Sequence, residues 1–508
     1  MSSTEPSAAH SASHSASAAS AASAPAHVPW RTKCAIVSIG LLSFIGILTE
    51  TSMNVTFPTL IGELSVSLAT VQWLTTGYLL LVTIVMSTTA WVLKRFTPRA
   101  LFFFALAASA IGVGLCLIAP SFPLLLAGRM VQACATGIAT PLMYQLIFTR
   151  VPLRRIGTYV GFASIIISLA PALGPTYGGI MTSVWSWRTI FVGVLPVLVF
   201  VAVLGTISVR GEAPGVGERR FDIIGVVLLA ALFTMVLLAF SAAGRGGWGA
   251  PTFWIDLVVC ALVCAVLAWH AAHGSRRVFD YSILRIRMIR LRLFGYFGLQ
   301  FINIGLSFVL PLFVQNVLGA TAMQAGLMLL PGALLGAVAS PIAGRVYDRR
   351  GVRGPLLASI ALVIVALALF IGLVPSLTVA LVGVLYTLLR LGFNIGFGVT
   401  MSDASAQVAP RLKSDQNSLF SMMQQFAGSF GTAVMSAVIS ARMLGASTVD
   451  ATVVGSRVDF VILLVLGVCM LATIVVSFRV VRADAAATGV DAAAAADAAA
   501  ADAGRRTR

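Results

Sequence analysis

The stretch GRVYDRRGVR, from Gly344 to Arg353, separates two long apolar runs. A weaker copy, AWVLKRFTPR from Ala90 to Arg99, stands between two apolar runs much earlier in the chain. In this copy Ala90 replaces the first glycine and Lys94 replaces the acid. A loop that recurs in this way predicts an internal repeat.

A second echo supports the repeat. GRMVQACATG (Gly128 to Gly137) resembles LRLGFNIGFG (Leu389 to Gly398), so that Arg129 corresponds to Arg390. The chain thus divides into two related halves of six helices each, and the two apolar runs between them form a central insert.

The composition places these helices in a membrane. Of the 508 residues, 59% are hydrophobic and only 10% are charged, and the mean hydropathy is +0.98. So few charges cannot cover a water-soluble surface. The net charge of +17 does not indicate nucleic-acid binding, because Lys and Arg form short clusters between apolar runs and no basic domain.

A membrane-spanning helix needs about 20 mostly apolar residues. By this measure we predict an all-α integral membrane protein with fourteen spans. The predicted spans are 35–57, 71–93, 100–119, 122–147, 157–181, 189–209, 222–242, 253–273, 293–315, 324–344, 354–374, 377–400, 418–441 and 458–480.

Five segments follow from these spans. Residues 1–33 form a disordered tail, 34–210 and 276–482 the two six-helix bundles, 211–275 the two-helix insert, and 483–508 a second disordered tail. Basic residues crowd the loops on one side, whereas the other side holds only Arg188, Arg245, Arg442 and Arg457. The positive-inside rule therefore predicts a plasma-membrane protein with both termini in the cytoplasm.

Three motifs resemble those of one known family. GRVYDRRGVR fits the G-x-x-x-D-R-x-G-x-R loop of the major facilitator superfamily, and APALGPTYGG (Ala170 to Gly179) resembles its G-P-x-x-G-G antiporter motif. LTETSMNVTFP (Leu48 to Pro58) looks like the first span of the fourteen-helix drug:proton antiporters of EmrB/QacA type, with Thr49 at the usual acid position. This TET form is more similar to the lincomycin-resistance branch.

The resemblance implies a proton-coupled antiporter that exports small amphiphilic compounds by alternating access. The alternatives are a proton-coupled importer, or an exporter of lipids, peptides or metabolites on the same fold. An enzyme is disfavoured, because the spans hold no paired carboxylates, no His pair and no nucleophile elbow. We expect no cofactor and no metal, and the partners to be amphiphilic substrates, protons and membrane lipid, with the chain a monomer. The chain has no phosphate-binding loop, so the proton gradient is the expected energy source.

Glu50 is the candidate proton site. It lies deep in the first predicted span, where an ionised carboxylate facing lipid costs at least about 2.5 kcal/mol. We therefore expect it to face a central cavity and to exchange protons, although a structural pairing with a buried Arg is the other interpretation.

Two arginines are candidates for coupling protons to substrate. Arg129, with Gln132 one turn later, lies at a depth similar to that of Glu50, and Arg390 is its counterpart in the second half. Because a buried guanidinium stays charged, it needs partners. Each arginine either changes partners during transport or ties helices together.

The remaining candidates have mechanical or binding roles. Gly174, Pro175, Gly178 and Gly179 of the antiporter motif allow close packing and bending. A cytoplasmic latch is expected at Gly344, Asp348, Arg349, Gly351 and Arg353. The candidate cavity lining, chosen for its polar, aromatic and adaptable side chains, comprises Asn54, Trp73, Tyr78, Asn394, Met422, Gln425 and Phe426.

Overall fold

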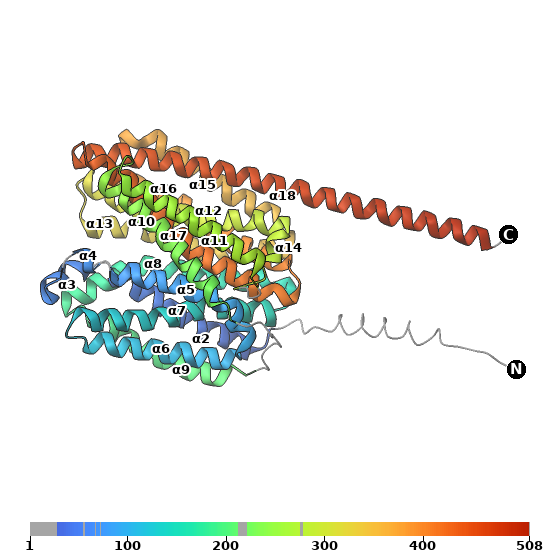
Figure 1. Ribbon diagram of the computed structural model, residues 1–508, viewed down its shortest axis with the longest axis horizontal. Coiled ribbons are helices and arrows are strands. Elements are labelled where there is room, and N and C mark those ends of the chain that lie inside the picture. Colours follow the sequence, from blue (N-terminus) through green and yellow to red (C-terminus); the bar gives the residue numbers. More distant parts are fainter. Residues whose placement is uncertain are drawn as a thin grey trace.

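The computed structural model is helical throughout and describes residues 28–53, 56–66, 68–71, 73–211, 221–274 and 278–506. Figure 1 shows the first half of the chain in blue to green below the second half in yellow to red. The long helices lie side by side in one bundle. Apolar side chains surround nearly every helix, as expected when lipid rather than water is the solvent.

The first half contains six long helices and two short ones. The long helices are α2 (Trp30–Met53), α5 (Trp73–Arg95), α6 (Pro98–Ile118), α7 (Phe122–Arg150), α8 (Ile156–Val184) and α9 (Thr189–Ser208). The short helices α3 (Phe57–Leu64) and α4 (Leu68–Val71) follow α2 at one end of the bundle. The helix α2 packs against α7, α8 and α9.

The second half also has six spans. They are α12 (Arg287–Asn316), α13 (Ala322–Leu327) with α14 (Leu330–Arg350), α15 (Arg353–Leu373), α16 (Val379–Ala406), α17 (Lys413–Met443) and α18 (Thr448–Arg506). The halves meet where α8 packs on α14 and where α5 packs on α17. This pairing confirms the two six-helix bundles predicted from the repeat.

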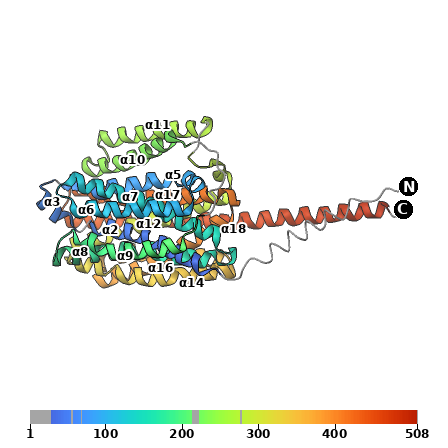
Figure 2. The same ribbon diagram turned by 90° about the horizontal axis from the view of Figure 1, so that it is seen from below.

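The helices α10 (Ile223–Gly246) and α11 (Pro251–His273) form a layer outside both halves. Figure 2 shows them stacked at the edge of the bundle, with α11 outermost. The inner helix α10 packs against α5 and α17, while α11 packs chiefly on α10. His270 and Asp222 join the pair at one end, with 2.9 Å between the imidazole Nε2 and a carboxylate oxygen.

Within the described residues, thirteen helices are long and apolar enough to cross a membrane. We count α17 as the fourteenth span, because it runs 31 residues in the middle of the bundle. Its first turns carry Ser414, Asp415, Gln416, Asn417 and Ser418, all buried between helices. Since these polar groups face protein rather than lipid, they lower the hydropathy of the helix without preventing it from crossing.

The ends of the chain differ from our expectation. Helix α2 begins at Trp30, inside the segment 1–33 that we assigned to a tail, and residues 1–27 lie outside the described part. Helix α18 continues to Arg506 through most of the segment 483–508 for which we predicted disorder. Alanine has the highest helix propensity, and this segment is rich in it.

Candidate functional site

The two ends of the bundle differ in charge. We call the end that holds the loops α5–α6, α7–α8, α14–α15 and α16–α17 the basic end, because those loops carry clustered Arg and Lys. We call the other end, where α3, α4 and α13 lie, the opposite end.

Arg129 of α7 is the most deeply buried charge of the first half, with no exposed surface. Its Nη1 donates to the Gln132 side-chain oxygen at 2.6 Å and to the Thr49 hydroxyl at 3.4 Å. Its guanidinium carbon lies 4.1 Å from the centre of the Tyr78 ring. The predicted pairing of Arg129 with Gln132 is therefore present, and a cation–π contact stabilises the charge from α5.

Tyr78 is a structural member of this cluster as well as a candidate cavity residue. Its hydroxyl is 2.7 Å from the Thr136 hydroxyl and donates to the Gly46 carbonyl at 3.2 Å. These bonds tie α5 to α2 and α7, and the ring is fully buried. The sequence did not reveal Thr136, which lies one turn beyond Gln132 on the same face of α7.

Glu50 is the open group at this site. It lies near the end of α2, half-buried, next to Thr49. Among the described residues it forms no ion pair or hydrogen bond, although the charge of Arg129 acts on it electrostatically. Two donor atoms of Arg129, Nε and Nη2, also have no partner in the described part of the chain. A free carboxylate and an incompletely bonded guanidinium therefore lie close together without being locked to one another.

The antiporter motif holds α8 against the same part of α2. A Cβ atom at Gly174 would overlap the Thr51 hydroxyl, and one at Gly178 would lie 2.5 Å from the Ser52 carbonyl oxygen. The Ser52 hydroxyl donates to the Gly174 carbonyl at 2.9 Å. Pro175 is exposed, and Gly179 has open space around it. Two of the four motif residues thus make the helix contact beside Glu50, and two do not.

Arg390 occupies a comparable place in the second half. Its Nη1 donates to the Asn303 side-chain oxygen of α12, and Asn394 donates to the Arg390 carbonyl at 3.0 Å. The Phe393 ring centre lies 5.2 Å from its guanidinium carbon. Asn303 was not among the predicted site residues, although a lone amide in the apolar run FINIGLSFVL was a usable signal. Arg390 and Arg129 thus bond to different partners in different halves of the bundle.

The candidate cavity residues do not form one cluster. Trp73 is 51% exposed, whereas Met422 is buried. Phe426 stacks on Phe233 of α10, with 4.3 Å between the ring centres. Gln425 is half-buried, and it is the preceding Gln424 that accepts a 2.8 Å hydrogen bond from the Tyr296 hydroxyl. Asn54 lies outside the described residues.

The aromatic side chains of α17 instead belong to a wider cluster between α10, α12 and α17. Phe426 and Phe430 are parallel, with 5.6 Å between ring centres, and Phe240 and Phe301 contact Phe430 at 5.2 Å and 5.5 Å. Sequence reasoning did not find this cluster, because its members come from three separate helices.

The expected latch lies at the basic end, where Asp348 crosses from α14 to α8. Its carboxylate accepts from the Gly157 and Thr158 amides, both at 2.9 Å, and from the Thr158 hydroxyl at 2.6 Å. Gly344 permits this approach, since a Cβ there would overlap the Gly157 carbonyl. An anionic group at a helix N-terminus is stabilised by the free amides and by the helix dipole.

The other latch residues do not join the two halves. Arg349 is exposed. Gly351 has a φ of 81°, which suits glycine at the end of α14. Arg353 lies over Phe478 of α18, with 5.7 Å between the guanidinium carbon and the ring centre. The partners of Asp348 are thus backbone amides and a hydroxyl rather than an arginine.

A second cross-half contact involves Lys94. In the first half it replaces the acid of the repeated loop, and it forms an ion pair with Asp415 of α17. Asp415 also accepts from the Asp280 amide at 3.0 Å. In both halves the repeated loop thus contributes a charged side chain to a contact with the other half. The side chain is an acid, Asp348, in the second half and a base, Lys94, in the first. The sequence showed Lys94 without showing its partner, which lies more than three hundred positions away.

Further hydrogen bonds between the halves lie at the same end. Asn417 donates to the Pro141 carbonyl at 2.6 Å, Ser418 to the Met86 carbonyl at 2.8 Å, and Lys413 to the Phe148 carbonyl at 3.1 Å. Together with Asp348 and Lys94 they close the basic end.

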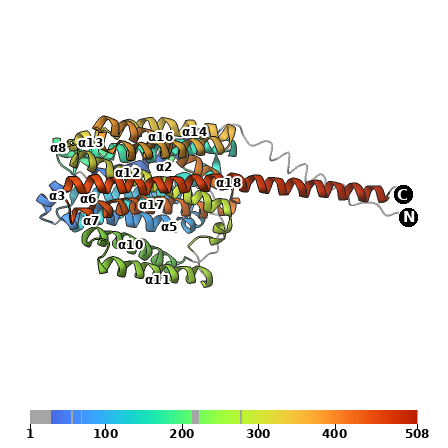
Figure 3. The same cartoon turned by 90° about the horizontal axis from the view of Figure 1, so that it is seen from above.

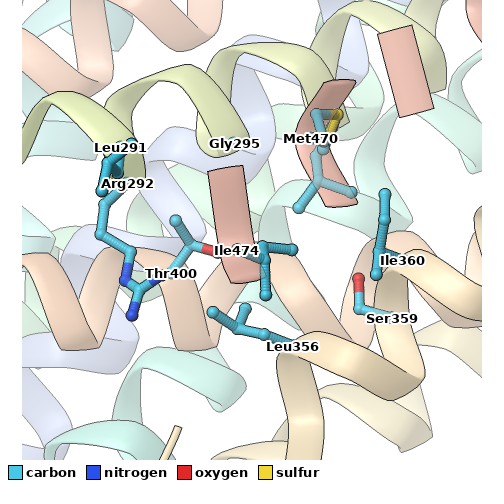
Figure 4. Close-up of a pocket in the computed structure, with 10 residues that line it drawn as sticks. Leu291, Arg292, Gly295, Leu356, Ser359, Ile360, Thr400, Met470 and Ile474 are labelled. Atoms are coloured by element: carbon cyan, nitrogen blue, oxygen red, sulfur yellow. The ribbon is translucent and has the colours of Figure 1, made fainter. Parts of the chain in front are cut away.

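The small pocket in Figure 4 lies inside the second half. Leu356, Met470 and Ile474 line it, and Arg292 reaches in from α12 beside Thr400. It has room for about one water molecule, roughly 10 Å³. Arg292 is paired with Asp403 at 2.5 Å and donates to the Ser477 hydroxyl at 3.0 Å. This pocket is packing around a buried ion pair and is too small for an organic substrate.

Comparisons with known proteins agree with this architecture. The family model described as Major Facilitator Superfamily matches residues 39–432. The lincomycin resistance protein LmrB of Listeria monocytogenes is 32% identical over 406 residues, which is 80% of this chain and 86% of that protein. The multidrug resistance protein B homolog of Mycobacterium tuberculosis is 30% identical, over 77% of this chain and 73% of that protein.

The fold is similar to that of a solved transporter. The human organic anion transporter MFSD10 (TETRAN) superimposes with a TM-score of 0.61 at 14% identity, covering 86% of this chain and 99% of that one. At this identity the likeness concerns the fold alone. The family match, by contrast, runs from α2 through the insert and into α17, and the chain belongs to the Major Facilitator Superfamily.

Proposed function

We propose that this chain is a proton-driven exporter of small amphiphilic compounds that works by alternating access. The observation that carries the proposal is the Glu50 carboxylate, which has no bonded partner among the described residues, beside the incompletely bonded Arg129. The names of the relatives, which refer to lincomycin and multidrug resistance, support the substrate class. The aromatic side chains packed around Phe426 are apolar groups of the kind that line sites for amphiphiles.

The orientation follows from the basic end. Since Lys and Arg collect on the cytoplasmic side of plasma-membrane proteins, we place the basic end in the cytoplasm, together with both termini. The cross-half contacts of Asp348, Lys94 and Asn417 then close the cytoplasmic side. We infer from this that the present arrangement is an outward-facing state of a monomer, in which Glu50 exchanges its proton with the outside.

The coupling depends on which cation the Glu50 carboxylate attracts. While Glu50 is ionised, its negative charge favours a neighbouring cation, either Arg129 or a cationic substrate. Once Glu50 takes up a proton, that attraction ends and the substrate is released outward. The neutral site then allows the halves to rock, which breaks the Asp348 contact and opens the cytoplasmic side. Loss of the proton to the cytoplasm prepares the site for the next substrate molecule.

Proton-flux measurements in proteoliposomes test this mechanism. We compare the wild type with Glu50→Gln, using a panel of cationic and neutral amphiphiles that includes a lincosamide. The variant should keep downhill substrate exchange but lose substrate-driven proton movement. Asp256→Asn is the matched control, because Asp256 lies on the peripheral helix α11. Equal substrate-driven proton flux in wild type and Glu50→Gln would refute the role of Glu50.

Transport of substrate is the broader test. A pump-deficient host that expresses the protein should accumulate less dye or lincosamide than the same host without it. If none of the amphiphiles is exported, the substrate class is wrong, whatever Glu50 does.

A further inference from the structure

Helix α18 carries a buried acid that the mechanism above does not use. Asp459 has no exposed surface. Neither of its carboxylate oxygens has a hydrogen-bond partner among the described residues, and the same is true of the Ser456 hydroxyl one turn earlier. A buried polar group without a partner is rare in folded proteins and calls for an explanation.

Contacts on either side of Asp459 fix its place. Thr452 accepts from the Asn316 amide of α12 at 3.2 Å. Gly455 packs against Ile439 of α17, and Phe460 lies 5.1 Å from Phe370 of α15, ring centre to ring centre. Figure 3 shows α18 crossing the bundle beside α12 and α17. Asp459 therefore lies inside the second half, about 10 Å along the helix from Thr452 and the opposite end.

The charges of the neighbouring helices lie near the ends of those helices. Those of α12 lie in its first turns, where Arg292 binds Asp403 and Ser477, and α15 carries only Arg353, which lies over Phe478. Ser477 and Phe478 are about 27 Å along α18 from Asp459. Helix α17 is charged at Lys413 and Asp415, at the basic end, and at Arg442, which is exposed, while Arg457 on α18 itself is also exposed. None of these charges forms an ion pair or a hydrogen bond with Asp459 among the described residues.

An ionised carboxylate in such a place carries a large uncompensated desolvation cost, which a bound proton removes. A multivalent metal is a poor alternative, because no group of three His, Cys, Asp or Glu side chains converges in the described part of the chain. The ligand that fits this site is a single proton.

We propose that Asp459 is a second proton site of the transporter, occupied in the packing seen here and emptied when the second half rearranges. Release breaks the carboxyl O–H bond, passes the proton to water and leaves the carboxylate ionised; uptake reverses this step. The inference rests on the proton coupling proposed above, to which it adds one proton per cycle.

The maximum substrate gradient that the protein can maintain tests whether Asp459 carries a second coupled proton. In proteoliposomes held at a pH difference of one unit, each coupled proton contributes about a tenfold factor to that gradient. Asp459→Asn, which mimics the protonated side chain in shape, should therefore lower the gradient about tenfold while leaving some proton-driven transport. Glu50→Gln should abolish the coupling altogether, because Glu50 is the group that exchanges a proton for the substrate. An unchanged gradient in Asp459→Asn overturns the second site and leaves the role of Glu50 standing.

Chemical labelling of the wild type provides a measurement that needs no variant. Dicyclohexylcarbodiimide modifies protonated carboxyl groups in apolar surroundings, and mass spectrometry of peptides locates the product. We expect labelling at Asp459 at neutral pH, with an extent that changes when a transported amphiphile is added. Labelling that stays constant with and without substrate shows a permanently protonated structural group and overturns the proposal, even if Asp459→Asn fails to fold.

Discussion

Removal of the Asp348 carboxylate should shift the protein from the outward-facing toward the inward-facing state. In Asp348→Ala, two backbone amides and one hydroxyl at the start of α8 lose their acceptor across the interface. A hydrogen bond to a charged group contributes about 1.5–3 kcal/mol, but this carboxylate is half-exposed and water replaces part of each bond. A total of about 3 kcal/mol remains, which corresponds to roughly a hundredfold change in the ratio of the two states.

Distances between spin labels at the basic end measure this ratio. Labels at Arg99 and Arg411 suit the purpose, because both residues are exposed and lie on different halves. The wild type should give one short distance, and Asp348→Ala should add a longer one. Arg349→Gln is the control, since Arg349 is exposed and adjacent in sequence. If Asp348→Ala keeps the wild-type distance distribution under all conditions, the contact does not hold the basic end closed.

Three further perturbations address other contacts. For the Lys94–Asp415 pair, Lys94→Asp alone should destabilise the outward-facing state by about 1 kcal/mol or more. The exchange of both residues, Lys94→Asp with Asp415→Lys, should restore part of that stability. If the effects of the two substitutions are additive in a double-mutant cycle measured with the same spin labels, the pair contributes nothing. Gly178→Ala should lower thermal stability and transport, because its Cβ would lie 2.5 Å from a backbone oxygen. Gly179→Ala, whose Cβ would face open space, should change neither. Equal melting temperatures of the two variants in detergent would contradict the close contact. Asn303→Leu should lower stability by about 1.5–3 kcal/mol, because the buried Arg390 guanidinium loses its side-chain acceptor on α12. Asn303→Asp, which keeps an acceptor, should retain folding, and a stable Asn303→Leu beside an unstable Asn303→Asp would contradict this explanation.

The sequence alone determined the membrane architecture of this protein. Long apolar runs can hardly be anything but spanning helices, because a bilayer satisfies no backbone hydrogen bond. The repeated loop and the repeated arginine then divided the spans into two halves and separated α10 and α11 from both. Gln132 was correctly placed beside Arg129, since residues three apart on a helix share a face.

Only the tertiary structure decided which groups meet across helices. Nothing in the local sequence joins Lys94 to Asp415, Asn303 to Arg390, or Tyr78 to Arg129, because each pair combines residues from different helices whose rotation depends on the packing of the whole bundle. The sequence also shows acids at positions 50 and 459 without showing their surroundings. Only the packing shows that Glu50 lies half-buried beside Arg129, and that Asp459 is enclosed with no hydrogen-bond partner among the described residues. Hydropathy is a property of consecutive residues, so the spans can be predicted from the sequence. The pairing of charges depends on the relative positions of side chains from distant segments, which no single segment specifies.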